Sequence, residues 1–270
     1  SEAVALGLKL AEKLNGIFDS PASIGQGYAI MMAKKHDAYS ITLDDVLENA
    51  DLIIFWGANP AESVHRHASK FSVFPRGEKI HRGVEMRVLT VMDVRETDTM
   101  RIAMNKLMLN VGGDLELINA MEVAYDGGKL YGDIAGISQK TFYSFMRDLK
   151  NSDFTAVFYG LGIIGNGSAE KNLEALYKFT DKLKASGKKS TAMPIPEQFN
   201  MVGCVEKTLE ATGFPSAVDF SVNPPSHSLK HTSIIPTLLK EEADAIITIG
   251  VDPMAHLPHQ AAERLMKLPL

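Results

Sequence analysis

The stretch Ala50-Asp51-Leu52-Ile53-Ile54-Phe55-Trp56-Gly57-Ala58-Asn59-Pro60 decides the fold of this chain. It is a short apolar run, rich in β-branched side chains, that closes on Gly-x-Asn-Pro. Such a run suits a strand buried on both faces of a parallel sheet, and the glycine and proline then force a turn. The phrase returns as Ala243-Asp244-Ala245-Ile246-Ile247-Thr248-Ile249-Gly250-Val251-Asp252-Pro253. The repeat predicts a unit of strand, loop and helix that is used twice.

The rest of the chain alternates strand and helix signals around this phrase. Strands are predicted over 87–92, 107–111 and 154–159, and helices over 114–125, 139–149 and 169–184. This alternation favours an α/β fold with a mostly parallel sheet and helices on both faces. Ligands of such sheets bind beyond the carboxyl ends of the strands. The loops that follow the strands are therefore the first places to look for a site.

Composition excludes several classes of protein. The chain has 270 residues, a net charge of −5 and a sequence pI near 5.9, which argues against a nucleic-acid partner. Cys204 is the only cysteine, so this chain can form no intrachain disulfide and no cysteine cluster, and a reducing cytoplasm fits best. No apolar segment reaches the roughly 20 residues that span a bilayer. The first residues read as a helix rather than a signal peptide, and we expect a fragment or a reduced relative of a longer protein.

Three segments allow both a functional and a plain interpretation. The loop 19–27 is rich in glycine and could cradle an anion, although a plain loop is the better interpretation. His65 and His67 lie two residues apart and would point in different directions from a helix, so solvated or capping histidines are favoured over a metal site. The polar run 93–99 would make a good pocket wall, or a loop whose side chains satisfy one another.

Several longer motifs carry a family resemblance. They are Asp51 to Ser63 (DLIIFWGANPAES), His67, Phe71 to Gly77 (FSVFPRG), Asp93 to Thr99 (DVRETDT), Tyr159 to Gly162 (YGLG), Gly213 to Pro215 (GFP), Asp219-Phe220 and Asp252 to His256 (DPMAH). In this order they resemble the B subunit of formylmethanofuran dehydrogenase, one of the molybdopterin oxidoreductases. The resemblance covers nearly the whole chain.

The resemblance implies two interlocked Rossmann-like domains that clamp a molybdopterin guanine dinucleotide cofactor carrying tungsten or molybdenum. It implies one discontinuous domain, 1–24 plus 134–270, and an inserted domain, 25–133, with a crossing near 131–139. In the family, the complex interconverts carbon dioxide and formylmethanofuran. By analogy the cofactor-binding residues are Gly57, Asn59, Glu62, Asp93, Arg95, Thr97, Gly160, Gly162 and Asp252.

This sequence departs from the family where the chemistry should be. The family loop Ser-Val-Cys-His-Gly, with a metal-ligating cysteine or selenocysteine, is here Ser23-Ile24-Gly25-Gln26-Gly27. Glycine has no ligand atom and glutamine does not titrate. The family segment Met-Pro-Met-Arg-Gly-His likewise ends here in Glu197 and Gln198. We therefore predict a degenerate site with no catalytic residue and no metal ligand, and Cys204 falls in a helical stretch where it cannot substitute.

Three hypotheses follow, and whether the chain is an enzyme is left open among them. The leading one is a non-redox structural subunit in one-carbon metabolism, as in the related formyltransferase/hydrolase complex of methylotrophic bacteria, with other subunits as partners. The second is an oxidoreductase component that still binds the metal-bearing pterin. The third is a nucleotide-binding module that rests on Asn59, Asp93 and Arg95. For a subunit, we also expect an exposed apolar patch, given 13 methionines.

Overall fold

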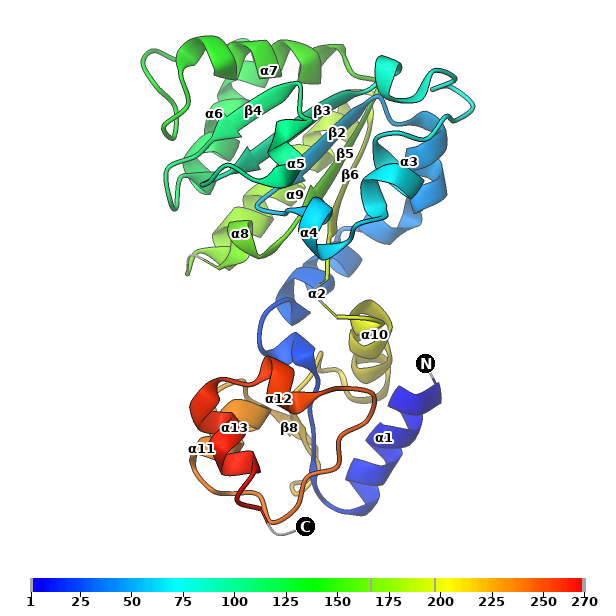
Figure 1. Cartoon of the computed structure of the whole chain (residues 1–270), viewed down its shortest axis with the longest axis vertical. Coiled ribbons are helices and arrows are strands. Elements are labelled where there is room, and N and C mark those ends of the chain that lie inside the picture. The colour runs from blue at the N-terminus through cyan, green and yellow to red at the C-terminus, as the bar shows by residue number, and fades with distance from the viewer. Residues whose placement is uncertain (1, 166, 197, 269–270) are drawn as a thin grey trace. The chain divides into compact units, whose positions relative to one another are not determined.

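The computed structural model describes residues 2–165, 167–196 and 198–268 (Figure 1). The chain divides into two compact units, which are described separately. The larger unit comprises residues 32–195, and the terminal unit comprises residues 1–31 and 196–270. Helix α2, Gly27–Lys35, begins in the terminal unit and ends in the larger one. One unit is thus inserted into the other in sequence.

A five-stranded parallel sheet organises the larger unit, in the order β4-β3-β2-β5-β6. Its strands are β2 (Leu52–Trp56), β3 (Val88–Asp93), β4 (Asn105–Met108), β5 (Phe154–Tyr159) and β6 (Lys189–Pro194). The first copy of the repeated phrase supplies the central strand, in which every residue is buried. A strand with neighbours on both sides and cover on both faces must be apolar throughout, which explains the unbroken run.

Alternating side chains of these strands enter two separate cores. On one face, Ile53 and Phe55 of β2, Val91 of β3 and Phe158 of β5 share a hydrophobic cluster with residues of the preceding helix and the connecting loops. On the other face lie the long helices (Figure 1). The helices of this unit are η2 (Ala38–Ser40), α3 (Leu43–Asn49), α4 (Pro60–Ser63), the π-helix η3 (Ala68–Ser72), η4 (Gly83–Met86), α5 (Asp98–Arg101), α6 (Asp114–Tyr125), α7 (Gln139–Asn151), α8 (Leu161–Ile164) and α9 (Ala169–Ala185).

The terminal unit is mainly helical. Its helices are α1 (Glu2–Lys13), η1 (Pro21–Ser23), the start of α2, α10 (Met201–Thr212), α11 (Ile234–Leu239), α12 (Pro253–His256) and α13 (His259–Leu265). Three antiparallel strands of two residues each, β1 (Ile17–Phe18), β7 (Val218–Asp219) and β8 (Ser226–His227), form its sheet in the order β1-β7-β8. Ala22, Ile30, Met201 and Val205 form a small core between α2 and α10.

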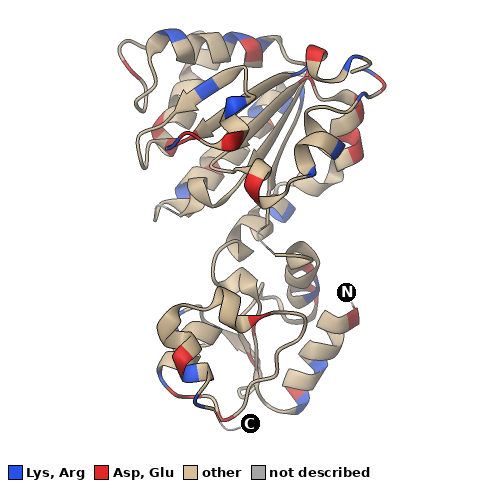
Figure 2. Cartoon of the chain, viewed as in Figure 1, with Lys and Arg blue, Asp and Glu red and all other residues tan. Residues whose placement is uncertain are grey.

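The predicted α/β fold with a parallel sheet is confirmed. The structure also contains the capping box that begins α3, in which Thr42 and Asp45 exchange hydrogen bonds between side chain and backbone. Basic and acidic side chains are interspersed over both units (Figure 2). Within the described residues, no helix is both long and apolar enough to cross a membrane.

The second copy of the phrase does not form the predicted strand. Residues 245–249 are not part of any sheet, and Ile247 and Ile249 are 63% and 53% exposed. The sequence pattern is suitable for a strand, but β2 lies between two partner strands, whereas 245–249 pairs with none of the described residues. The predicted parallel sheet of the second Rossmann-like domain is accordingly replaced by the short antiparallel one.

The domain boundaries also differ from the prediction. We expected 25–133 as the inserted part, but the inserted unit runs from 32 to 195. The reason is strand pairing, because β5 lies directly beside β2 and β6 beside β5. The segment 131–139 is therefore an internal connection between α6 and α7 of the larger unit and not a crossing between domains.

Candidate functional site

The predicted loops meet at the carboxyl edge of the parallel sheet. The loop after β2 holds Gly57 and Asn59, and the loop after β5 holds Gly160 and Gly162. The chain leaves β2 toward β3 on one side, while β5 lies on the other side. The two loops therefore flank a topological switch point, which is where open α/β sheets bind their ligands.

Three glycines bring these two loops into direct backbone contact. The amide of Gly162 donates to the carbonyl of Gly57 at 3.0 Å, and the amide of Gly160 donates to the carbonyl of Trp56 at 3.0 Å. Gly57 has a φ of +54°, and a Cβ there would lie 2.6 Å from the Cα of Gly162. A side chain cannot fit between the loops, so the glycines are required for this approach.

Asn59 joins the loop after β2 to helix α5. Its Oδ1 accepts from the hydroxyl of Thr99 at 2.7 Å and from the amide of Thr99 at 3.2 Å. Among the described residues, the buried Nδ2 of Asn59 has no hydrogen-bond acceptor. Buried donors are nearly always paired in folded proteins, so the Nδ2 group of Asn59 is available to donate to an acceptor of a bound molecule.

The polar run after β3 mostly satisfies itself. Thr97 caps α5 by accepting from the amide of Met100 at 3.2 Å, and Asp93 accepts from the amide of Arg95 at 3.1 Å. The Asp93 carboxylate and the Thr97 hydroxyl thus both stabilise the turn. This agrees with the interpretation of the run as a loop whose side chains satisfy one another. Arg95 is exposed, and so is Glu62 in α4.

The structure adds a buried pair that sequence reasoning missed. The indole Nε1 of Trp56 donates to Oδ1 of Asp114 at 2.8 Å, at the start of α6. Burial raises the pKa of Asp114, the Trp56 hydrogen bond opposes that rise, and the nearby Asp93 carboxylate adds to it. The signal available in the sequence was an aspartate directly after Gly112-Gly113 at a helix start, a position where carboxylates are favoured.

The remaining predicted residues lie in the terminal unit, which is a separate body. Asp252 caps α12 by accepting from the amide of Met254 at 3.0 Å. Nε2 of Gln198 lies 3.2 Å from Nδ1 of His256, so the two predicted motifs at 198 and 252–256 do meet. Glu197 lies outside the described residues.

The loop that departs from the family pattern is nevertheless tightly held. Asp19 accepts from the amide of Ser20 at 2.8 Å, the hydroxyl of Ser23 at 2.8 Å, the amide of Ala217 at 3.0 Å and the amide of Ile234 at 2.7 Å. Burial raises the pKa of Asp19, although these hydrogen bonds favour its ionised form. The carboxylate therefore fixes the loop against two other segments of the terminal unit.

Gly25 and Gln26 follow this anchor. Gly25 is exposed, whereas the side chain of Gln26 is buried and, among the described residues, its Oε1 has no hydrogen-bond partner. Glycine has no ligand atom, and the neutral side-chain amide of Gln26 cannot take up or release a proton as an imidazole does. In the described part of the chain no three His, Cys, Asp or Glu residues gather in a way that could hold a metal ion.

Cys204 lies beside this loop, where its thiol interacts with the side chain of Ser20. It lies within α10, and burial raises the pKa of its thiol, which disfavours the ionised form that binds metals. Among the described residues, the 19–27 loop therefore lacks the thiolate ligand that the family resemblance implies for its metal. The two histidines after β2 also differ in role: His67 is buried with Nδ1 3.1 Å from the hydroxyl of Ser72, and His65 is exposed.

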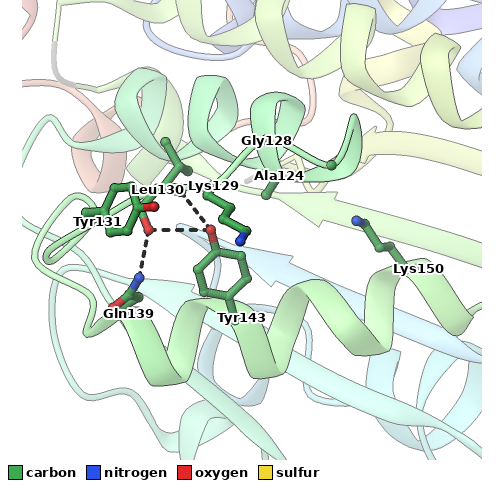
Figure 3. A pocket seen from close by; sticks show the side chains of 9 residues that line it. Ala124, Gly128, Lys129, Leu130, Tyr131, Gln139, Tyr143 and Lys150 are labelled. Carbon is green, nitrogen blue, oxygen red and sulfur yellow. Dashed lines mark hydrogen bonds between the residues drawn. The ribbon is translucent and has the colours of Figure 1, made fainter.

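A surface cavity lies elsewhere in the larger unit (Figure 3). It measures about 330 Å³ and lies between the end of α6 and the side of α7. Tyr143 there accepts from the amide of Leu130 at 2.8 Å, while the side chains of Lys129 and Lys150 border the space. None of the predicted site residues lines it, so it is separate from the loops at the carboxyl edge.

Comparison with known proteins gives two relatives of the same kind. Over 265 residues the chain is 33% identical to the B subunit of the tungsten-containing formylmethanofuran dehydrogenase 2 of Methanocaldococcus jannaschii, covering 98% of this chain and 61% of the relative. Over 269 residues it is 30% identical to the protein of the same name from Methanococcus maripaludis, covering 99% of this chain and 62% of the relative. The chain thus spans less than two thirds of the length of either relative.

The fold also has a solved counterpart. It aligns with a TM-score of 0.62 and 19% identity to a chain in the crystal structure of the formyltransferase/hydrolase complex (FhcABCD) from Methylorubrum extorquens in complex with methylofuran. The alignment covers 90% of this chain and 63% of the solved one. At this identity the likeness concerns the fold. No family model matches the chain.

Proposed function

We propose, on the premise that this chain belongs to the family of formylmethanofuran dehydrogenase B subunits, that it is a non-redox structural member of that family. It would serve in a formyl-transferring and formyl-hydrolysing complex of one-carbon metabolism, in the cytoplasm, with the other subunits of that complex as its partners. The relatives are named as tungsten-containing, so the proposal separates this chain from them in chemistry while it keeps their fold.

The loop at Gly25 and Gln26 carries this proposal. Asp19 holds the loop in one shape, yet the two positions that should supply a metal ligand and a titrating group offer neither. A redox subunit needs both at this place, whereas a structural subunit needs only the shape. The fold shared with a chain of the formyltransferase/hydrolase complex supports the same assignment.

Metal and pterin analysis of the natively purified protein tests the proposal. Cells would be grown with tungstate and molybdate both supplied, so that a missing metal reflects the protein and not the medium. Elemental analysis and fluorescence of oxidised pterin should then each give far less than one equivalent per chain. One equivalent of tungsten or molybdenum would overturn the structural role and support the rival oxidoreductase component.

A second candidate function is a nucleotide-binding module at the carboxyl edge of the sheet. The buried Nδ2 of Asn59, which lacks an acceptor among the described residues, favours it, as does the glycine-lined switch point beside it. GDP and GTP at millimolar concentration should raise the melting temperature, with no rise in an Asn59→Ala variant. An unchanged melting temperature of the wild-type protein would reject the module.

A further inference from the structure

The edge strand β4 leaves one of its faces bare. In β4, strand alternation places Lys106 and Met108 on one face and Leu107 on the other, and Met104 lies in the bend directly before the strand. Met104 and Met108 are 68% and 47% exposed and Lys106 is exposed, whereas Leu107 is fully buried on the face where α7 packs. We call Met104, Lys106 and Met108 the β4 face. Two exposed methionines thus flank an exposed lysine at this edge of the sheet.

The neighbouring strands show what is missing. Val91 of β3 pairs with Lys106 in the parallel ladder and belongs to the same face, yet Val91 is fully buried in the hydrophobic cluster. The connection from β3 to β4 contributes only α5, which has four residues, and α5 packs on β3. Crossovers in parallel sheets usually carry a full helix that covers the next strand. The helices that cover this face of the sheet thus extend over β3 but not over β4 (Figure 1).

The lysine decides what kind of partner fits. Among the described residues, Lys106 has no ion pair. A second copy that paired across this edge would bring one lysine close to its equivalent, and like charges on facing strands repel. Lysine on an edge strand is also a common protection against pairing with another strand. An acidic group flanked by apolar ones satisfies all three side chains together.

The spacing defines the shape of that partner. Met108 lies four residues after Met104, so the two are at most about 13 Å apart along the chain. On a helix, eight residues span about 12 Å, with the residue four along at the midpoint. We propose that the β4 face receives a helix of another subunit, with apolar residues eight apart and an aspartate or glutamate midway between them. This inference rests on the proposed function as a complex subunit, and methionines suit such adaptable contacts.

Methionine oxidation of the natively purified complex tests the inference, with the isolated chain for comparison. Hydrogen peroxide oxidises exposed methionines, and mass spectrometry reads each residue. Met104 and Met108 should oxidise at least fivefold more slowly in the complex. Met266 and Met254, which are 65% and 47% exposed in the terminal unit, serve as matched controls and should not change.

Charge reversal gives the second measurement. Lys106→Glu should weaken binding of the chain to the remaining subunits by tenfold or more, whereas Lys129→Glu, another exposed lysine of the larger unit, should leave it unchanged. A carbodiimide should also join Lys106 to an acidic residue of a partner helix.

The outcomes separate the two proposals. If the chain co-purifies with partners but Met104 and Met108 oxidise as fast as in the isolated chain, the inference falls and the structural role stands. If both methionines of the isolated chain oxidise more slowly as the concentration of the chain rises, a second copy covers the β4 face. The proposed helix of another subunit is then refuted. If no partner co-purifies, the proposed function fails and the inference fails with it.

Discussion

Replacing Gly57 by alanine tests whether the contact between the two glycine loops holds the carboxyl edge together. The new Cβ would lie 2.6 Å from the Cα of Gly162 and 2.7 Å from the amide nitrogen of Ile163. Both neighbours are backbone atoms, so the clash cannot be relieved by rotating a side chain. The loops after β2 and β5 must move apart, and the hydrogen bond between Gly162 and the Gly57 carbonyl must lengthen.

The magnitude follows from two separable costs. Alanine at a positive φ is strained by about 1–2 kcal/mol, and overpacking adds about 1–3 kcal/mol. Gly112 provides the control, because it also has a positive φ, of +80°, but a Cβ there would meet nothing within 4 Å. We expect Gly57→Ala to lower the free energy of unfolding by about 2–5 kcal/mol, and Gly112→Ala by about 1–2 kcal/mol, from strain alone.

Urea unfolding followed by tryptophan fluorescence is the assay. The chain has one tryptophan, and Trp56 is buried at the end of β2, so its emission reports on the larger unit alone. The difference between the two variants measures the clash. Equal losses in both variants would show that the loops move apart at no cost, and the close packing argued for this edge would then be refuted.

Three other perturbations test groups buried in the two units. Burial lowers the pKa of His67 to about 4 from 6.5. The unfolded state therefore binds the proton first, and the free energy of unfolding falls as the pH drops below about 6.5. By pH 5 this loss should be about 2 kcal/mol in the same fluorescence assay, and it should be absent in His67→Gln. Asn59→Ala and Thr99→Val should each cost about 1 kcal/mol, and their double mutant clearly less than the sum; additive costs would argue against their hydrogen bonds. Asp19→Ala should remove about 3 kcal/mol of local stability and speed hydrogen exchange of the α11 amides about a hundredfold, whereas unchanged exchange would deny the anchoring role.

The apolar run at 52–56 was enough to predict the sheet, because a strand with partners on both sides and two covered faces admits almost no polar residue. The second copy at 245–249 has the same pattern and forms no strand. Periodicity reports what a segment could bury, and whether it does so depends on partner strands that a local pattern does not contain. For the same reason the boundary expected at 133 was misplaced, since only the pairing of β5 with β2 assigns residues 134–195 to the larger unit.

The candidate site was predictable in part. Glycines and polar side chains after β2, β3 and β5 were expected at one sheet edge, and the topology brings them there. That Asn59 binds Thr99 and that Trp56 binds Asp114 could not be predicted, because each pair joins side chains about 40 or more positions apart in the sequence. The assignment of Asp252 to the same site remains a prediction, since it lies in the other unit.

The carboxylate of Asp19 fixes the shape of the 19–27 loop independently of the residues that would carry its chemistry. Its hydrogen bonds reach Ser20, Ser23 and two distant segments, and none of them involves Gly25 or Gln26. Ligand atoms can therefore be exchanged at these two positions without dismantling the support beneath them. A metal ligand can therefore be lost at this loop while the scaffold is kept. A variant carrying Gly25→Cys and Gln26→His would likewise start from a backbone that Asp19 already holds.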